Sequence, residues 1–406
     1  MRLLERLLNL KPSILSRQAL AILRRFGTNA HAYIPGIGTI SGLTAGNYLL
    51  ADGSTGLTPT DGLQGLVLDA AGSVGPLLKG AVAPIASTTG FSSGQATLSL
   101  VSNEIVFTQT AGVYAQVVVS PPLVAEIGKT YRVEATFRRG THTAIQMQVQ
   151  RGAAGSYAVI VATSMLTNTT NVTKELYFTA TATDTVISVT SVGVPGDTSY
   201  VASFTVQEVT GIHATSSGAA RPTLRLTSGR YSSQYAGAQS LTLGSVPFQM
   251  SDDHFVIAAG RIDNGAVPTQ TLFGCANSST ANPLVGQLSF NLTGVTGNMR
   301  DNAGTLIAAG TGTLAIGETF VGSLIRTTGS VLVRKNGVSG TPVSTTGLGA
   351  TTLTTATIGA STRTTVVSAV TGAVGPVIIG KGTLTAAEAL TLERFVASLT
   401  PSAPSF

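Results

Sequence analysis

The chain has 406 residues, of which 43 % are hydrophobic and only 10 % are charged. This length predicts two to four domains, and the hydrophobic content excludes a disordered protein. The net charge is +6, but residues 1–27 hold six basic residues and one acidic residue, so the rest of the chain is almost neutral. This distribution excludes a nucleic-acid-binding surface over the body of the protein.

Cysteine usage and hydropathy limit the class further. Cys275 is the only cysteine, so an intramolecular disulfide is impossible and we expect a buried thiol. No apolar run approaches the ~20 residues that span a bilayer, so we expect no membrane insertion. Glu5, Arg6, Asn9 and Lys11 interrupt the first residues, and we expect no classical signal peptide.

Residues 1–27 predict a basic amphipathic helix. Apolar residues recur at helical spacing on both sides of Pro12, and Gly27 is a natural helix end. Such a helix is compatible with a membrane surface, a transit peptide, packing on its own chain or on sister copies, or docking onto a partner protein. Because Phe26 is the only aromatic anchor, we favour docking onto protein. The candidate anchoring residues are Leu7, Ile22, Phe26, Arg24 and Arg25.

Residues 28–80 are glycine-rich, with short strand candidates at 47–51 and 65–69. They contain too few apolar residues for a core of their own. We therefore interpret this stretch as an anchoring connector that is ordered by contact with its neighbours.

Residues 81–209 predict a β-sandwich. Strand candidates with alternating apolar and polar residues begin at 97, 104, 114, 131, 144, 158, 175, 186 and 203, with turn signals between them. The motif Gly-Lys-Thr-Tyr-Arg-Val at 128–133, with Phe-Thr-Ala-Thr-Ala-Thr-Asp-Thr-Val-Ile-Ser-Val at 178–189, resembles the jelly roll of carbohydrate-binding modules. The resemblance implies a glycan-binding fold.

Residues 210–406 predict a second β-sandwich that ends in a helix. Asn336-Gly337 marks a hairpin turn, and Thr385 with Glu388 forms a capping-box signature at the start of an apolar helical stripe. The final strand at 373–381, followed by this helix, resembles the close of laminin-G-like, concanavalin-type domains. The fold class expected for the whole chain is mainly β, with two consecutive β-sandwich domains after a short N-terminal helix and a Gly-rich connector.

Two linker motifs add a further resemblance. Gly-Leu-Val-Leu-Asp-Ala-Ala-Gly-Ser-Val-Gly-Pro at 65–76, with His-Ala-Thr at 213–215 before Ala-Ala-Arg-Pro-Thr-Leu at 219–224, resembles virion proteins of tailed bacteriophages. The resemblance covers about residues 45–400 and leaves the N-terminal helix outside. It implies a structural protein on the exterior of the virion, on the tail or the capsid.

No motif for catalysis or metal binding is evident. The four histidines lack metal-ligand spacing, and we expect them at turns or on the surface. Asp252-Asp253-His254 is the densest titratable cluster, but two carboxylates are too few for Ca²⁺. The carboxylates that glycoside hydrolysis would need stand in no recognisable motif. We therefore expect that the protein is not an enzyme and that it has no catalytic residues, no bound metal and no cofactor. The carboxylates considered are Glu104, Glu126, Glu134, Asp263 and Asp301.

Glycan binding would use exposed aromatic and polar loop residues, because sugar faces stack on aromatic rings. The chain has nine tyrosines and no tryptophan. Tyr231 and Tyr235 are predicted to be an exposed pair in a polar loop, and Arg300, Asp301 and Asn302 form a turn-like loop that could meet sugar hydroxyls.

These features predict a non-enzymatic virion appendage, foremost a tail fibre or receptor-binding protein that presents its sandwiches to host surface polysaccharide. A head fibre or capsid-decoration protein is one alternative, and a cell-surface carbohydrate-binding protein or glycan-degrading enzyme is another. Because the helix stripe has no evident partner within the chain, residues 1–80 are expected to bind other virion proteins and to form a homotrimer. Removing residues 1–80 is then expected to leave folded monomeric sandwiches.

Overall fold

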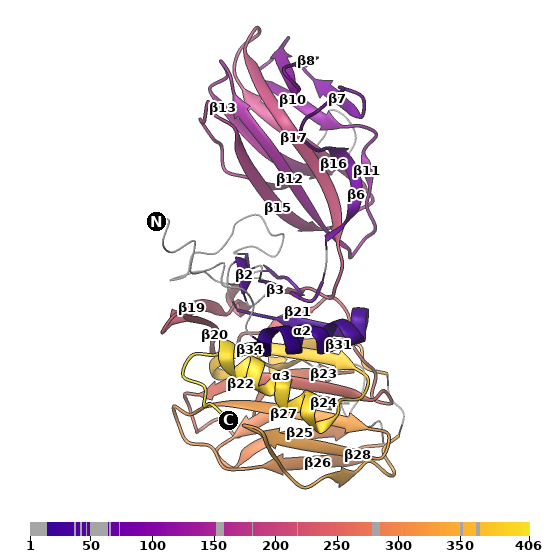
Figure 1. Ribbon diagram of the computed structural model, residues 1–406, viewed down its shortest axis with the longest axis vertical. Helices are drawn as coiled ribbons and strands as arrows, with labels where there is room; N and C mark the ends of the chain where they lie inside the picture. Colours follow the sequence, from indigo (N-terminus) through magenta and orange to yellow (C-terminus); the bar gives the residue numbers. More distant parts are fainter. Residues whose placement is uncertain are drawn as a thin grey trace. The chain divides into compact units, whose positions relative to one another are not determined.

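The computed structural model describes residues 14–35, 38–40, 43–45, 47–48, 64, 66–72, 74–151, 158–180, 182–216, 218–277, 285–301, 303–349, 352–362 and 366–406. The described residues form two compact units. Unit 1 contains those up to residue 72 and those from 211 onward, and unit 2 contains those from 74 to 210. Each unit is a β-sandwich (Figure 1), so the predicted mainly-β fold is confirmed.

Unit 2 consists of two six-stranded antiparallel sheets. Sheet 2a has the order β14 (Ala158–Ala162), β13 (Ala144–Arg151), β16 (Asp184–Val192), β10 (Tyr114–Val119) and β7 (Phe91–Gly94), with β11 (Leu123–Val124) beside β16. Sheet 2b has the order β15 (Val172–Thr179), β12 (Thr130–Arg139), β17 (Thr198–Val209), β9 (Glu104–Gln109) and β8 (Ala96–Val101), with β6 (Val74–Ala81) beside β17.

The core of unit 2 follows from strand alternation. Successive side chains of a strand point to opposite faces of the sheet. In β13, Ile145, Met147 and Val149 are fully buried between the two sheets. The residues between them are glutamines, which therefore face the outer side of sheet 2a.

Unit 1 consists of two nine-stranded sheets. Sheet 1a has the order β19 (Thr223–Thr227), β20 (Arg230–Ala236), β34 (Thr371–Lys381), β22 (His254–Ile262), β27 (Thr319–Thr327), β28 (Ser330–Lys335) and β29 (Val338–Ser339), with β1 (Ala30–Tyr33) beside β34 and β30 (Val343–Ser344) beside β28. Sheet 1b has the order β26 (Leu306–Thr311), β25 (Gly294–Arg300), β24 (Val285–Asn291), β23 (Gln270–Ala276), β31 (Thr355–Ile358), β21 (Leu241–Leu243), β18 (Ala214–Thr215), β5 (Leu66–Val67) and β4 (Asn47–Tyr48). Unit 1 also contains two-stranded ribbons, which are β2 (Gly38–Ile40) with β3 (Leu43–Ala45) and β32 (Ser361–Thr362) with β33 (Val366–Val367). Its short 3-10 helices are η1 (Gly27–Asn29) and η2 (Gly218–Ala220).

Two helices form a third layer on the outer face of sheet 1a. In β22, Val256 and Ala258 face the core between the sheets, whereas Phe255 and Ile257 face a second core beneath the helices. Helix α2 (Ile14–Phe26) packs beside α3 (Ala386–Leu399), as Figure 1 shows. No helix among the described residues is long and apolar enough to cross a membrane.

The predicted capping box at the start of α3 is confirmed. The Thr385 hydroxyl accepts a hydrogen bond from the Glu388 backbone N–H at 3.2 Å, and the Glu388 carboxylate accepts one from the Thr385 backbone N–H at 2.9 Å. Both amides would otherwise lack a partner in the first helical turn.

The expectation that the N-terminal stripe has no partner within the chain is wrong for α2. Leu20 and Leu23 are buried in the core beneath the helices together with Phe395 of α3. Ile22 is buried in the same core, and the Phe26 ring lies 5.1 Å from the Phe255 ring. Most of the stability of a short helix comes from burying its apolar face, and here its own sandwich supplies the surface.

The charged anchoring candidates have separate environments. Arg25 pairs with Glu388 of α3 at 2.9 Å, and Arg24 is exposed. Leu7 lies outside the described residues. Because the apolar face of α2 is already covered, it does not supply the exposed surface on which docking to a partner was predicted.

The described part of residues 28–80 contributes strands to both units. Strand β1 extends along β34, where His31 lies opposite Ile379, and β5 pairs with β18. The buried carboxylate of Asp69 accepts the Ala32 backbone N–H at 2.9 Å and lies 2.6 Å from Nδ1 of His31. Strand β6 joins sheet 2b of unit 2 through β17.

The histidines were expected at turns or on the surface, and this expectation is wrong. His31, His142, His213 and His254 are all buried. His254 lies with its ring stacked on Phe248 at a centroid distance of 3.8 Å, and its Nδ1 is 2.8 Å from the Asp252 carbonyl oxygen. Burial lowers the pKa of His254 from its ordinary value of 6.5 to about 4, and the nearby Arg326 also lowers it.

This shift predicts acid destabilisation of unit 1. The folded state binds the proton more weakly than the unfolded state, so the stabilisation is fully present above pH 6.5 and is lost as the pH falls to about 4. The free energy of unfolding of unit 1 should fall by about 3 kcal/mol over this range through His254. Denaturant titrations at pH 7 and pH 4, compared with His254→Phe, measure the contribution. An equal fall in the variant would contradict it.

Candidate ligand-binding groove

The structure places the sequence-predicted tyrosine pair in a strand, not in a polar loop. Tyr231 and Tyr235 both belong to β20. Tyr235 is 1 % exposed and lies in the core between the sheets, whereas Tyr231 is half-buried. The expectation of an exposed pair is therefore wrong, because the Tyr235 side chain is buried in this core.

The second predicted site is a loop whose conformation is held by the carboxylate of Asp301. Asp301 is buried, and its carboxylate accepts backbone N–H groups of Gly349 at 2.7 Å and Thr305 at 2.9 Å. The hydrogen bond from Gly349 holds the pKa of Asp301 below its ordinary value. Arg300 ends β25 and is half-buried, and Asn302 lies outside the described residues. Asp301 thus organises the turn and does not present a free carboxylate to a sugar.

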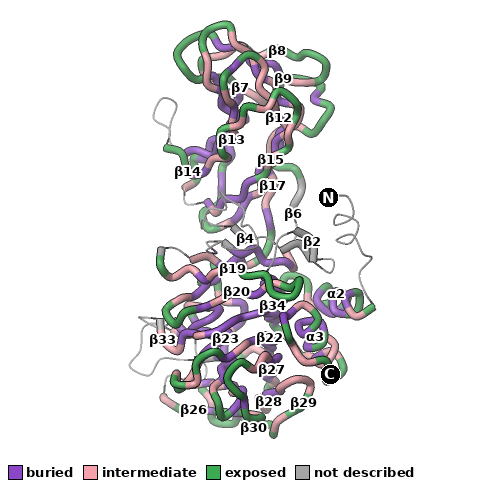
Figure 2. Tube along the Cα trace, turned by 90° about the vertical axis from the view of Figure 1, so that its left-hand side faces the viewer, coloured by how far each residue is buried: buried purple, intermediate pink, exposed green. Residues whose placement is uncertain are grey.

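A groove of about 730 Å³ lies in unit 2, on the outer face of sheet 2a. It crosses several strands of this sheet, among them β7, β13 and β14, which Figure 2 labels. Its lining residues are Ser92, Ser93, Gly94, Gln95, Tyr114, Gln116, Val118, Gln146, Gln148, Gln150, Val159, Met165 and Thr190.

Strand register builds the floor of the groove. One row of residues crosses four neighbouring strands: Gln146 of β13, Thr190 of β16, Gln116 of β10 and Gly94 of β7. Each of these residues lies directly opposite the next one in the row. Neighbouring strands are ~4.8 Å apart, so this polar row extends about 14 Å across the sheet. A Cβ at Gly94 would lie 3.2 Å from the Gln116 amide oxygen. Glycine therefore keeps that end of the row open.

A buried amide network lies in this floor. Gln148, Gln150 and Thr190 are 7 %, 4 % and 2 % exposed. Nε2 of Gln150 donates to Oε1 of Gln148 at 2.7 Å, and the Thr190 hydroxyl lies 3.4 Å from the same oxygen. Among the described residues, none hydrogen-bonds Oε1 of Gln150. A buried acceptor without a partner costs free energy unless a ligand or water donates to it.

The rim of the groove adds exposed apolar surface to this polar floor. Tyr114 is 54 % exposed, Val159 52 % and Met165 43 %. A groove that combines one exposed aromatic ring with amide and hydroxyl groups can hold the apolar face of a sugar ring and exchange hydrogen bonds with its hydroxyls. None of the lining residues carries a carboxylate or a basic group.

The outer face of sheet 2b differs in chemistry. Arg132 pairs with Glu175 at 3.0 Å and contacts Glu134, while Arg138 pairs with Glu104 at 2.7 Å. These charged side chains satisfy one another on the surface. Sheet 2a is thus the face of unit 2 that presents an uncharged groove.

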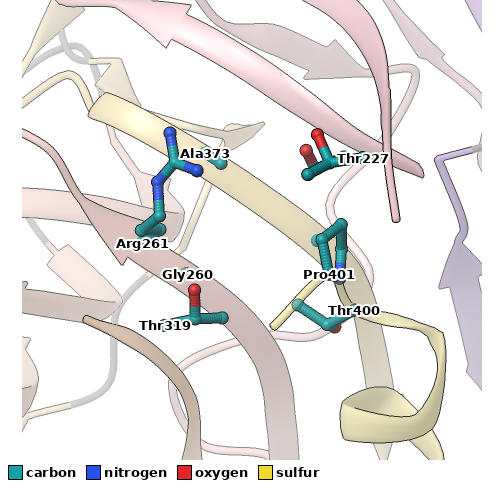
Figure 3. Close-up of a pocket in the computed structure, with 9 residues that line it drawn as sticks. Thr227, Gly260, Arg261, Thr319, Ala373, Thr400 and Pro401 are labelled. Carbon is teal, nitrogen blue, oxygen red and sulfur yellow. The ribbon is translucent and has the colours of Figure 1, made fainter. Parts of the chain in front are cut away.

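A hollow in unit 1, shown in Figure 3, is too small for a sugar. It is lined by Thr227, Arg261 and Pro401 among others and has a volume of about 10 Å³, room for roughly one water molecule. Arg261 is engaged there, because its Nε and Nη2 donate to Asp263 at 2.7 and 2.8 Å. This hollow is therefore not a ligand site.

The carboxylates considered for hydrolysis are engaged elsewhere. Glu126 pairs with Lys129 at 3.2 Å, and Asp263, Glu104 and Glu134 have the arginine partners described above. Within the part of the chain that the structure describes, no group of three or more metal-ligating side chains is placed to hold an ion. What this surface offers is hydrogen bonding and stacking.

Sequence reasoning missed the groove, although its signal is visible in the chain. Gln146, Gln148 and Gln150 alternate with apolar residues in β13, a pattern that resembles an ordinary solvent-facing side of a strand. Only the pairing with β16 and β10 turns these glutamines into a continuous floor.

No protein-family model and no curated protein sequence matches the chain. Among solved structures, the Ruminococcus gnavus IT-sialidase CBM40 bound to alpha2,3 sialyllactose is similar, with 11 % identity, a TM-score of 0.34 and coverage of 40 % of this chain and 96 % of that one. Domain 4 of AbnA, a GH43 extracellular arabinanase from Geobacillus stearothermophilus in complex with arabinotriose, shows 16 % identity, a TM-score of 0.34 and coverage of 44 % and 83 %. The tandem CBM22 domains of Paenibacillus barcinonensis Xyn10C show 11 % identity, a TM-score of 0.31 and coverage of 76 % and 99 %. TM-scores this low carry no information about the ligand of this chain.

Proposed function

We propose that the chain is a non-enzymatic carbohydrate-binding protein and that unit 2 holds a glycan in the groove on sheet 2a. One observation carries this proposal: the buried network of Gln148, Gln150 and Thr190 lies in the floor of a groove whose rim includes the exposed Tyr114, and no described residue donates to the Oε1 acceptor of Gln150. Folded proteins rarely keep a buried acceptor unpaired without a reason. A ligand that supplies hydroxyl donors would satisfy it.

Tyr114→Ala tests the groove directly. Loss of the exposed ring should weaken glycan binding by about tenfold, because stacking and burial of the sugar face are lost. Isothermal titration of the full chain against a soluble polysaccharide that binds the wild type measures the change.

Tyr231→Ala is the matched control, since it removes the half-buried tyrosine of the site predicted from the sequence. It should leave the affinity unchanged. If Tyr231→Ala weakens binding and Tyr114→Ala does not, the glycan site lies in unit 1 and the groove assignment is wrong.

The location of the protein is a separate proposal. The linker motifs support a virion appendage, foremost a tail fibre or receptor-binding protein that presents the groove to host polysaccharide, with a head fibre or capsid-decoration protein as the alternative. Antibody to residues 211–406 should label the exterior of particles in electron micrographs. Absence of labelling would favour a cell-surface carbohydrate-binding protein.

Attachment to other virion proteins through residues 1–80, and a homotrimer, also remain proposals. The burial of α2 on its own sandwich removes the apolar stripe as their support. Light scattering of the full chain tests the trimer, and a monomeric mass would refute it.

The non-enzymatic part of the proposal rests on the groove chemistry. No carboxylate is found among the described lining residues of the groove, and glycoside hydrolysis normally needs two. Incubation with a polysaccharide that binds should release no reducing ends. Release would favour the glycan-degrading alternative.

A further inference from the structure

The described residues that line the groove on sheet 2a are all uncharged. The next charged residue along β13 is Arg151. It lies an even number of positions after Ile145, Met147 and Val149, whose side chains point into the core. Strand alternation therefore directs Arg151 away from the side that carries Gln146 and Gln148. The polar groups that a ligand would meet are amides and hydroxyls.

This chemistry discriminates between glycans. A carboxylate or sulfate placed in a groove loses part of its hydration, and the loss is offset only by a cation or several aligned donors. None of the described residues that line the groove is an arginine or a lysine that could pair with such a group. A hydroxyl, in contrast, both donates and accepts, and amide side chains match it in both roles.

The unpartnered oxygen of Gln150 makes the requirement more specific. Nε2 of Gln150 donates one of its two N–H groups to Gln148, whereas no described residue donates to its acceptor Oε1. An acceptor needs a proton donor, which an ionised carboxylate, a sulfate or a ring oxygen lacks. A sugar hydroxyl has one.

We infer that the groove selects uncharged polyhydroxylated chains over acidic ones, and that Gln150 is a specificity-determining residue that accepts a ligand hydroxyl. This inference rests on the proposed carbohydrate-binding function of unit 2.

The first experiment compares two sets of polysaccharides on the full chain at ~0.15 M salt, an ionic strength that screens long-range charge attraction. Dextran, mannan, xylan and arabinan are the neutral probes, and polygalacturonate, alginate and hyaluronate are the acidic ones. Retardation in affinity gels by at least one neutral probe and by no acidic probe supports the inference. Retardation by acidic probes alone, or equally by both sets, overturns the inference but leaves carbohydrate binding intact. Retardation by neither set overturns the proposed function as well.

The second experiment uses Gln150→Met, which keeps the length of the side chain and removes its polar atoms. Binding to the neutral probe should weaken about tenfold, the effect of losing one buried hydrogen bond to a ligand. Gln207→Met, the same substitution at a half-buried position of β17 in sheet 2b, should leave binding unchanged.

Thermal unfolding separates recognition from a structural role. Gln150→Met also removes the buried hydrogen bond from Nε2 of Gln150 to Gln148, so the melting temperature of unit 2 should fall by a few degrees while the unit stays folded at the temperature of the binding measurement. Unchanged affinity in Gln150→Met, or an affinity loss that only accompanies unfolding, would overturn the role assigned to Gln150.

Discussion

Glu393→Ala is expected to lower the free energy of unfolding of unit 1 by about 3–5 kcal/mol, the usual cost of removing one partner from a buried ion pair. Glu393 is fully buried on α3. Its carboxylate accepts hydrogen bonds from Nε of Arg334 at 2.7 Å, from Nη2 of Arg334 at 3.2 Å and from the Ser323 hydroxyl at 2.7 Å. The alanine variant leaves the arginine buried without its counter-ion.

Glu318→Ala is the matched control. Glu318 pairs with Lys335 at 2.7 Å, but its side chain is 30 % exposed and remains in contact with water. The expected loss is within about 1 kcal/mol. Urea titrations with separate probes for the two units measure both variants, and unit 2 should not change. A loss below about 1 kcal/mol for Glu393→Ala would mean that the pair does not hold α3 on sheet 1a.

Deletion of residues 1–35 is expected to destabilise unit 1 severely, in contrast to the expectation from the sequence that removing residues 1–80 leaves folded sandwiches. The segment buries four large apolar side chains, each of which contributes about 1.5–3 kcal/mol before chain entropy is subtracted. Its removal also uncovers Phe255 and leaves the β34 edge opposite β1 without its hydrogen bonds. The four side chains are Leu20, Ile22, Leu23 and Ile34.

Binding of a hydrophobic dye and loss of the unit 1 unfolding transition would report this deletion. Deletion of residues 1–13 alone serves as the control, because α2 begins at Ile14, and it should keep the transition. Unit 2 should unfold normally in both chains. If the longer deletion retains the full stability of unit 1, the packing of α2 and β1 contributes little to that stability, contrary to this expectation.

Local patterns in the sequence predicted the local structure well. The alternation of Ile145, Met147 and Val149 with glutamines gave a strand with one buried face, and Thr385 with Glu388 gave the start of a helix. Both signals depend on residues only a few positions apart, so no knowledge of distant contacts is needed.

Contacts between distant segments could not be predicted in the same way. The stripe of α2 shows that the helix must bury one face, but nothing local identifies α3, more than 350 residues later, as the surface that covers it. Tyr235 looked exposed among polar neighbours because the burial of one face of β20 depends on β34. The charged Glu393 within an apolar stripe gave no sign of Arg334.

The candidate groove depends on strand register for the same reason. Gln116, Gln146 and Thr190 come from three separate segments, and they meet only because β13, β16 and β10 pair in that order. A register shift of one residue would turn the glutamines of β13 into the core.

The most direct test of the central claim is a crystal structure of the full chain with a neutral oligosaccharide obtained from a polysaccharide that it binds. We expect the sugar on sheet 2a, with one ring against Tyr114 and one hydroxyl within hydrogen-bond distance of Oε1 of Gln150. An oligosaccharide bound only to unit 1, or only to sheet 2b, would contradict the claim that this groove is the glycan-binding site.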